Sequence, residues 1–346
     1  MTVPYRIAVV GAASLSGKEV NEELAESSFA ASDFVLLDDE EALGQLETVG
    51  DEVTIVQRIE PDSFEQVDFT FFCGSRELTR KHWKAAQRAG SSIIDMTRAL
   101  EKERGVLVRA PWVRDEMNGA ASKESPDLHT PAVIPAHPAA VALALLMLRL
   151  KNLGAVHSAA VTMLEPASEY GRAAMDELHQ QTVSLLSFQS LPREFYDTQV
   201  AFNLAPVLGE GAKLNLSETE ATVRRHYAHL SGGKLPPLAL QVIHAPVFHG
   251  HAFSIAIEME QPVLLEDVET ALSGDHVDVV LGDADAPSNL TTAGQEEVMV
   301  RLRGEDGPRS QRFWMWAAMD NLKFAAANAV ACALELRRLR PQGQVQ

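Results

Sequence analysis

The chain has very little cysteine. Only two of its 346 residues are cysteines, Cys73 and Cys332, and they lie far apart in apolar segments. Small extracellular domains that depend on disulfides carry more cysteines at closer spacing. The cysteine content therefore argues against a disulfide framework, and it predicts a protein of the reducing cytoplasm.

Long apolar runs are also lacking. The longest extends from Pro138 to Leu148 and ends at Arg149, whereas a membrane-spanning helix needs about 20 apolar residues. The first residues, MTVPYRIAVVGAASLSG, contain no basic segment before the apolar stretch and no cleavage motif. We therefore predict neither a signal peptide nor a membrane span.

Basic residues are too few to balance the acidic ones. The chain has 30 Lys and Arg against 48 Asp and Glu, which gives a formal net charge of −18 at pH 7. Proteins that bind nucleic acid or anionic lipid need a basic surface, so we expect neither partner. The hydrophobic content of 46% is that of an ordinary globular chain, and the length is sufficient for two domains.

A strand–helix–strand pattern opens the chain. Tyr5–Val10 is an apolar strand, Lys18–Ala25 has a helical pattern, and Asp33–Leu37 is a second strand. The pattern continues with strands over 52–58, 67–73 and 92–95 and a helix over 77–89. This order predicts an α/β fold with a parallel sheet and right-handed crossovers.

The second half has a different pattern. Gly, Ser, Pro and Asn are frequent between 118 and 135, which is typical of a loop between domains. Beyond it we expect an α+β domain, with helices over 138–150, 171–188 and 218–229 and strands over 157–164, 238–248 and 252–260. A final helix over 320–339 is long enough to return to the first domain. The segment Trp314-Met315-Trp316 is interpreted as core packing before that helix.

The segment Gly11–Gly17 (GAASLSG) follows a predicted strand and opens a predicted helix, a position where backbone amides favour a pyrophosphate. Gly11 permits the tight turn, and Gly17 permits close packing of helix on strand. Ser14 stands where a third glycine would let the phosphate approach. A Rossmann-type turn without a ligand is therefore an alternative interpretation.

An acidic run follows the second strand. Asp38 occupies the position expected for an acid that contacts a ribose, and the run Asp38–Glu41 opposes a 2′-phosphate by about 1 kcal/mol per charge at 4 Å in water. We predict a weak dinucleotide site or none, with NAD favoured over NADP. The alternative is a solvated acidic turn.

Several segments, spread in order over nearly the full chain, form a recognisable set. They are GAASLSG, Phe71–Ser75, Ile94–Thr97, His137–Ala140, Tyr170–Leu178, Ala201–Leu204, Ala245–His251 and Asp320–Val330. They resemble the aspartate-semialdehyde dehydrogenase family, whose corresponding segments are, in the same order, Gly-Ala-Thr-Gly-x-x-Gly, Phe-Phe-Ser-Ala-Gly, Ile-Asp-Asn-Thr, Asn-Pro-Asn-Cys, Gly-Ala-Gly-Lys-Ala-Ala-Met-Glu-Glu-Leu, Ala-Phe-Asn-Val, Val-Pro-Val-x-x-Gly-His and the last helix.

The resemblance implies a Rossmann-like NAD(P)-binding domain over 1–134, completed by the C-terminal helix at about 320–346. It also implies an α+β dimerisation and substrate domain over 135–319, whose sheet forms a homodimer. Active relatives reduce an aspartyl phosphate to the semialdehyde with NADPH, in amino-acid biosynthesis. A cysteine thiolate forms a thioacyl enzyme, and a histidine manages its proton.

Carried over position by position, the resemblance retains only His251, the acid/base candidate. The nucleophilic cysteine falls on Ala140, whose methyl group cannot form a thioester, and the glutamine that orients the acyl carbonyl falls on Glu165. The arginine for the substrate carboxylate falls on His244, and the arginine for phosphate falls on Glu101. A site that bound aspartyl phosphate would now repel it.

The cofactor positions carry over less completely. The basic group for the 2′-phosphate falls near Glu41, and Phe324 stands where a glycine lies close to the cofactor. We predict no metal. The predicted cofactor-binding residues are Gly11, Ala12, Ser14, Leu15, Ser16, Gly17, Asp38, Cys73, Gly74 and Asn321.

Two single residues and one pair of histidines have alternative interpretations. His137 is a candidate base or nucleophile, or a satisfied loop histidine. Cys73 is a candidate neighbour of the nicotinamide, or a small buried residue. If the strand over 238–248 continues, His249 and His251 share a face, but a metal there lacks a third ligand.

Three hypotheses follow. The first is a divergent homologue without the phosphorylating dehydrogenase activity, a pseudoenzyme that forms a homodimer or a heterodimer with an active relative. The second is an active NAD-linked oxidoreductase that uses His251 and Glu165 on an altered, neutral or cationic substrate. Ordinary aspartate-semialdehyde dehydrogenase activity despite Ala140 is a third interpretation with little physical support.

Overall fold

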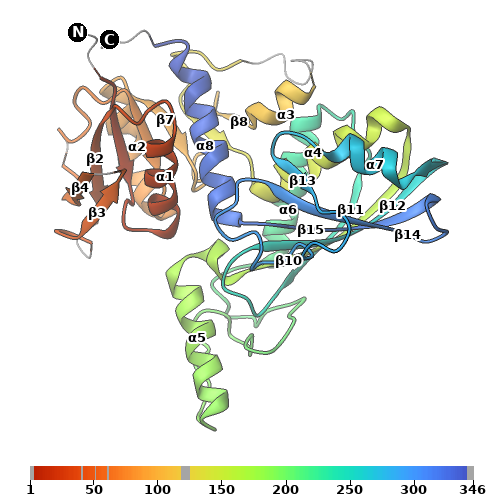
Figure 1. The fold of residues 1–346 in the computed structure, drawn as a ribbon. Coiled ribbons are helices and arrows are strands. Elements are labelled where there is room, and N and C mark those ends of the chain that lie inside the picture. The colour runs from red at the N-terminus through yellow and green to blue at the C-terminus, as the bar shows by residue number, and fades with distance from the viewer. Residues whose placement is uncertain (1–3, 40–41, 51, 61, 118–124, 341–346) are drawn as a thin grey trace. The chain divides into compact units, whose positions relative to one another are not determined.

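A computed structural model describes residues 4–39, 42–50, 52–60, 62–117 and 125–340 (Figure 1). The chain divides into two compact units, and each is described by itself. The N-terminal unit comprises 1–136 together with 325–346, and the C-terminal unit comprises 137–324. No helix of the described residues is both long enough and apolar enough to cross a membrane.

Within the described residues, the N-terminal unit is built on a seven-stranded sheet in the order β5-β2-β1-β6-β7-β9-β8. Its strand pairs are parallel, which confirms the predicted α/β class. The chain proceeds from β1 to one side and then returns to the other, as in Rossmann-like folds. The strands are β1 (Arg6–Val10), β2 (Asp33–Asp38), β5 (Gln57–Arg58), β6 (Phe69–Phe72), β7 (Ser92–Asp95), β8 (Leu107–Arg109) and β9 (Val133–Pro135).

Both faces of this sheet are buried. Ile7 and Val9 belong to one core cluster with residues of α1 (Leu15–Glu26) and α8 (Asn321–Arg337), whereas Ala8 and Val10 belong to another with residues of α2 (Arg76–Arg88). Alternate side chains of one strand thus enter opposite cores, which explains the continuous apolar run in the sequence. The short helix α3 (Pro111–Glu116) completes the unit.

Two predictions for this unit are wrong. The strand expected over 52–58 is divided, because β4 (Glu52–Ile55) pairs with β3 (Leu46–Val49) in a separate hairpin and only β5 joins the main sheet. The loop expected over 118–135 ends in β9, which lies inside the sheet between β7 and β8. Residues 118–124, and Glu40 and Glu41 of the acidic run, lie outside the described residues.

In the described residues, the C-terminal unit has a six-stranded sheet in the order β11-β10-β12-β15-β14-β13. Met163, Ile255 and Met315 are among the alternate residues that point into its core. The strands are β10 (Val156–Glu165), β11 (Leu238–His244), β12 (His251–Leu264), β13 (Val277–Val279), β14 (Val298–Gly304) and β15 (Arg309–Met319), and the helices are α4 (Pro138–Leu153), η1 (Ala167–Tyr170), α5 (Arg172–Leu186), α6 (Leu216–Ser231) and α7 (Leu265–Leu272).

The prediction of core packing for the tryptophan segment is wrong. Met315 is buried, but Trp314 and Trp316 are 37% and 38% exposed on the other face of β15. The segment is a strand, so its side chains alternate between the two faces. Strand β11 also ends at His244, four residues earlier than expected. His249 therefore lies between β11 and β12 rather than on a strand that leads to His251.

Candidate functional site

Three residues singled out in the sequence lie at one end of the C-terminal sheet. Glu165 and His244 are the last residues of β10 and β11 and are partners in the parallel register. His251 is the first residue of β12, which pairs antiparallel with β10 so that Leu164 lies opposite Ala252. The strand register thus brings together Glu165, His244 and His251, all of which are buried.

Ala140 lies in the first turn of α4, and its amide donates to the His137 carbonyl at 2.9 Å. A helix N-terminus favours a thiolate, yet residues 137–324 contain no cysteine. Cys73 and Cys332 are buried in the N-terminal unit, and burial raises the pKa of both thiols well above its ordinary value. Neither residue presents a thiolate at neutral pH.

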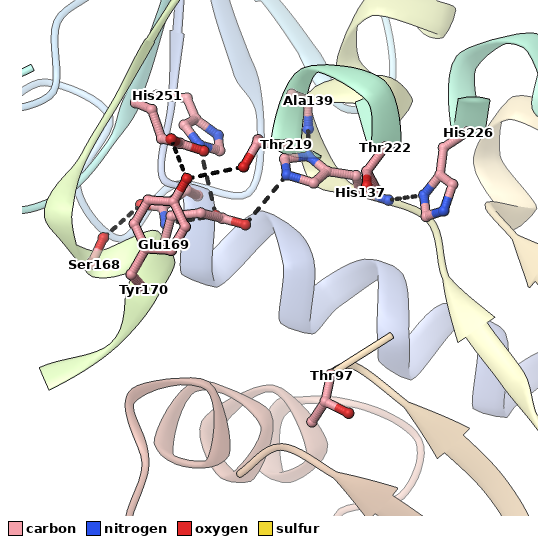
Figure 2. A network of polar contacts seen from close by, with 12 residues as sticks. Thr97, His137, Ala139, Ser168, Glu169, Tyr170, Thr219, Thr222, His226 and His251 are labelled. Atoms are coloured by element: carbon pink, nitrogen blue, oxygen red, sulfur yellow. Dashed lines mark hydrogen bonds and ion pairs between the residues drawn. The ribbon is translucent and has the colours of Figure 1, made fainter. Parts of the chain in front are cut away.

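The structure adds Glu169, which the sequence analysis missed. Glu169 lies in η1, directly after β10, and its carboxylate lies between two imidazoles (Figure 2). Glu169 Oε1 is 3.3 Å from His137 Nε2, and Oε2 is 3.6 Å from His251 Nε2. The two imidazole rings are stacked with centroids 6.0 Å apart. One carboxylate thus contacts two histidines from different elements.

Tyr170 was also missed. Its hydroxyl donates to Glu165 Oε2 at 2.6 Å, and the Thr219 hydroxyl lies 2.9 Å from the same phenol oxygen. Burial, followed by the negative charge of Glu165, raises the pKa of Tyr170 well above its ordinary value. The phenol therefore keeps its proton and holds the Glu165 carboxylate in place.

The orientation of His137 is set from its own side of the site. Its Nδ1 accepts from the Ala139 amide at 3.2 Å, and its backbone amide donates to His226 Nδ1 at 2.9 Å. Because Nδ1 is the acceptor, the ring hydrogen of the neutral imidazole is on Nε2, the atom that faces Glu169.

Asn321 makes contacts within the C-terminal unit. Its Oδ1 lies 3.1 Å from the Ser168 hydroxyl and accepts from the Gly250 amide at 3.0 Å. Its Nδ2 lies 3.5 Å from Glu169 Oε2. The side chain predicted to contact a cofactor thus connects η1 to the start of β12.

His244 gives the site no positive charge. The residue is fully buried, and burial lowers the pKa of its imidazole to about 4. Its ring lies against Tyr196, with centroids 4.7 Å apart. At neutral pH, His244 is a neutral group in an aromatic environment. Glu101, the other position matched to an arginine, lies in a turn of the N-terminal unit after β7.

In the predicted dinucleotide turn, some backbone amides already donate to side chains of the N-terminal unit. Ser14 Oγ accepts from the Gly17 amide at 3.0 Å and donates to the Cys73 carbonyl at 2.9 Å. Asp38 Oδ2 accepts from the Ala13 amide at 2.9 Å, and burial raises the pKa of this carboxyl group. The first-turn amides of α1, at residues 15 and 16, are the donors that helix geometry offers to a phosphate.

Comparisons with known proteins agree with this architecture. Residues 6–125 match the family model of the semialdehyde dehydrogenase NAD-binding domain, and residues 145–324 match that of the semialdehyde dehydrogenase dimerisation domain. The aspartate-semialdehyde dehydrogenase of Rickettsia bellii is 27% identical and covers 97% of this chain and 98% of its own. The USG-1 protein homolog of Pseudomonas aeruginosa is 32% identical, with 95% of this chain and 97% of its own covered.

Solved structures agree as well. A probable aspartate-semialdehyde dehydrogenase from Pseudomonas aeruginosa superposes with a TM-score of 0.81 at 27% identity and covers 96% of this chain and 98% of its own. The Candida albicans enzyme with NADP has a TM-score of 0.62 at 15% identity over 95% of this chain and 97% of its own, a likeness of fold alone. The chain therefore belongs to the aspartate-semialdehyde dehydrogenase family, with an NAD(P)-binding Rossmann-like domain and a dimerisation domain.

Proposed function

We propose that this family member does not catalyse the phosphorylating dehydrogenase reaction. The observation that carries the proposal is that residues 137–324 contain no cysteine, although α4 keeps the helix start at which Ala140 lies. Loss of a catalytic nucleophile lowers kcat by a factor on the order of 10⁶ in comparable enzymes. The protein acts instead as a binding or partner protein with the family fold.

The charge of the site supports the proposal. An aspartyl phosphate carries two anionic groups, and the end of the sheet presents the carboxylates of Glu165 and Glu169 together with a neutral His244. Like charges disfavour each other strongly in a buried site. The site therefore lacks a cationic clamp for an anionic substrate at His244, and its carboxylates oppose that substrate.

The test is an assay of NAD(P)-dependent oxidation of aspartate semialdehyde in the presence of phosphate, with an active relative as the positive control. We expect no turnover above background for the wild type, and none for Ala140→Ser. Turnover at about 1–10³ s⁻¹, the range of ordinary enzymes, would falsify the proposal. Activity in Ala140→Cys alone would support Ala140 as the position of the missing nucleophile.

For the cofactor, we propose weak dinucleotide binding with NAD preferred over NADP. The amides of Leu15 and Ser16 would hold the pyrophosphate, and Asp38 would accept from the ribose hydroxyls. A bound nicotinamide supplies hydride transfer. Calorimetric titrations of the wild type with NAD and NADP test this proposal, and tighter binding of NADP contradicts the role of Asp38.

An active oxidoreductase with an altered substrate is the second candidate. The hydrogen bond of 2.6 Å between Tyr170 and Glu165, beside His251, favours it because it places acid and base groups together. A panel of neutral and cationic alcohols with NAD tests this function. If this function is correct, Glu165→Gln lowers the activity at least about 100-fold, which is the lower end of what general acid–base catalysis contributes.

We further propose a homodimer formed through the sheet of the C-terminal unit. The match to a dimerisation domain supports it, and so does the exposed face of the sheet. Ala256 lies opposite Trp314, and Ser254 lies opposite Trp316, so small residues adjoin exposed rings. Co-purification with an active relative would indicate the heterodimer instead.

A further inference from the structure

We propose that the chain contains a binding site for a small carboxylate anion, formed by His137 and His251, and that its own Glu169 occupies this site as an internal ligand. The inference rests on the proposed function in that it assigns the same site to anion binding rather than to acyl transfer. It names the class of ligand, a small monocarboxylate, that these groups recognise.

The Glu169 carboxylate lies within ion-pair distance of both imidazoles. Each oxygen of Glu169 faces a different imidazole, at 3.3 Å and 3.6 Å, and Asn321 Nδ2 lies 3.5 Å from Oε2. A carboxylate offers about four acceptor positions, so two imidazoles and an amide suit it well. The side chain of Glu169 is only 9% exposed, and a buried carboxylate requires such partners.

The groups around Glu169 are positioned by contacts that do not involve it. Ala139 and His226 orient His137 from α4 and α6. The Gly250 amide, just before His251, is fixed by Asn321 Oδ1. We therefore expect His137, Asn321 and the backbone before His251 to stay in place when the Glu169 side chain is removed, as a preorganised site requires.

The other acidic group nearby has its own partner. Glu165 accepts the phenolic hydrogen of Tyr170, which Thr219 also contacts. Glu165 therefore has a donor in Tyr170, and both imidazoles contact Glu169.

The consequence concerns competition. A tethered group acts at an effective concentration of about the millimolar range or higher, so free acetate competes poorly with Glu169 in the wild type. The Glu169→Gly variant removes the tethered carboxylate and opens space for acetate. Glu169→Gln keeps the volume without the charge, and it is the matched control.

The experiment is a calorimetric titration of the full chain with sodium acetate, against sodium chloride at equal ionic strength. We expect Glu169→Gly to bind acetate at least about tenfold more tightly than the wild type, a difference of about 1.4 kcal/mol. Glu169→Gln is expected to behave as the wild type, and His137→Ala in the Glu169→Gly background is expected to lose the gain. Equal acetate binding by folded Glu169→Gly and wild type overturns the proposal.

A second measurement covers the case in which Glu169→Gly does not fold. The Nε2 resonances of His137 and His251 are assigned by NMR in the wild type and in Glu169→Gln. We expect both to shift when the carboxylate is lost, and unchanged resonances overturn the proposal. Neither measurement uses turnover, so an active wild type would refute the proposed function without deciding the anion site.

Discussion

The burial of His244 predicts how the stability of the protein depends on pH. Its imidazole has a pKa of about 4 in the folded protein, against 6.5 for an ordinary histidine, because burial opposes the charged form. The unfolded chain therefore binds a proton that the folded chain refuses. Stability rises with pH between these two values, and the contribution of His244 is lost as the pH falls from about 6.5 to about 4.

The magnitude follows from the two pKa values. Each unit of pKa corresponds to about 1.36 kcal/mol. The folded protein therefore loses about 3 kcal/mol of stability below pH 4, and about 2 kcal/mol of this loss has already occurred at pH 5. His244→Phe keeps a ring against Tyr196 and has no titrating group. Its packing cost does not depend on pH, so it cancels when the change with pH is compared with that of the wild type.

The assay is urea unfolding at pH 7.5 and pH 5. We expect the wild type to lose about 2 kcal/mol more than His244→Phe between the two values. His229→Gln, at an exposed position of α6, shows what replacement of a surface histidine does. If the wild type and His244→Phe lose the same stability, His244 is not held neutral, and the argument that it cannot clamp an anionic substrate fails.

Three further predictions concern the turn, the site and the dimer. Gly11→Ala should lower the free energy of unfolding in urea by about 2–4 kcal/mol, because φ is +82° and a Cβ would lie 2.3 Å from Gly74. The control is Gly44→Ala, which has a similar φ but open space around the new Cβ, and it should lower the free energy of unfolding by about 1 kcal/mol. Tyr170→Phe should lower the free energy of unfolding by about 1–3 kcal/mol, since Glu165 loses its short hydrogen bond; equal stability would contradict this role. Trp316→Glu should give monomers by analytical ultracentrifugation, whereas Leu46→Glu, also exposed, should sediment as the wild type.

The sequence predicted the first βαβ unit well because two physical constraints coincide there. Strand β1 is buried on both faces and so reads as a continuous apolar run, and Gly11 and Gly17 mark the turn where backbones approach closely. Strand β15 was missed for the opposite reason. The run Trp314-Met315-Trp316 is apolar on both faces, yet only Met315 is buried, and composition cannot distinguish an exposed apolar face from a core.

The site was predictable only in part. Glu165, His244 and His251 were identified from the sequence, and one hypothesis combined Glu165 with His251. The proximity of all three depends on the register of β10, β11 and β12. The sequence signal for Glu169 was weak, because an acidic residue in a short polar turn usually faces solvent. The available indication was its position four residues after Glu165, where the chain leaves the sheet beside the other two strand ends.

The chain's own carboxylates affect the two kinds of ligand differently. The two oxygens of Asp38 accept from the amides of Ala13 and Asp39. In the proposed site a dinucleotide also contacts the helix start through its pyrophosphate, so its binding does not require Asp38 to move. A small acyl phosphate has few contacts besides its anionic groups, and Glu169 holds the imidazoles that would receive them. Under the proposed function, divergence of this kind removes the small substrate before it removes the dinucleotide. NAD binding measured without substrate should consequently be the same in Glu169→Gln as in the wild type.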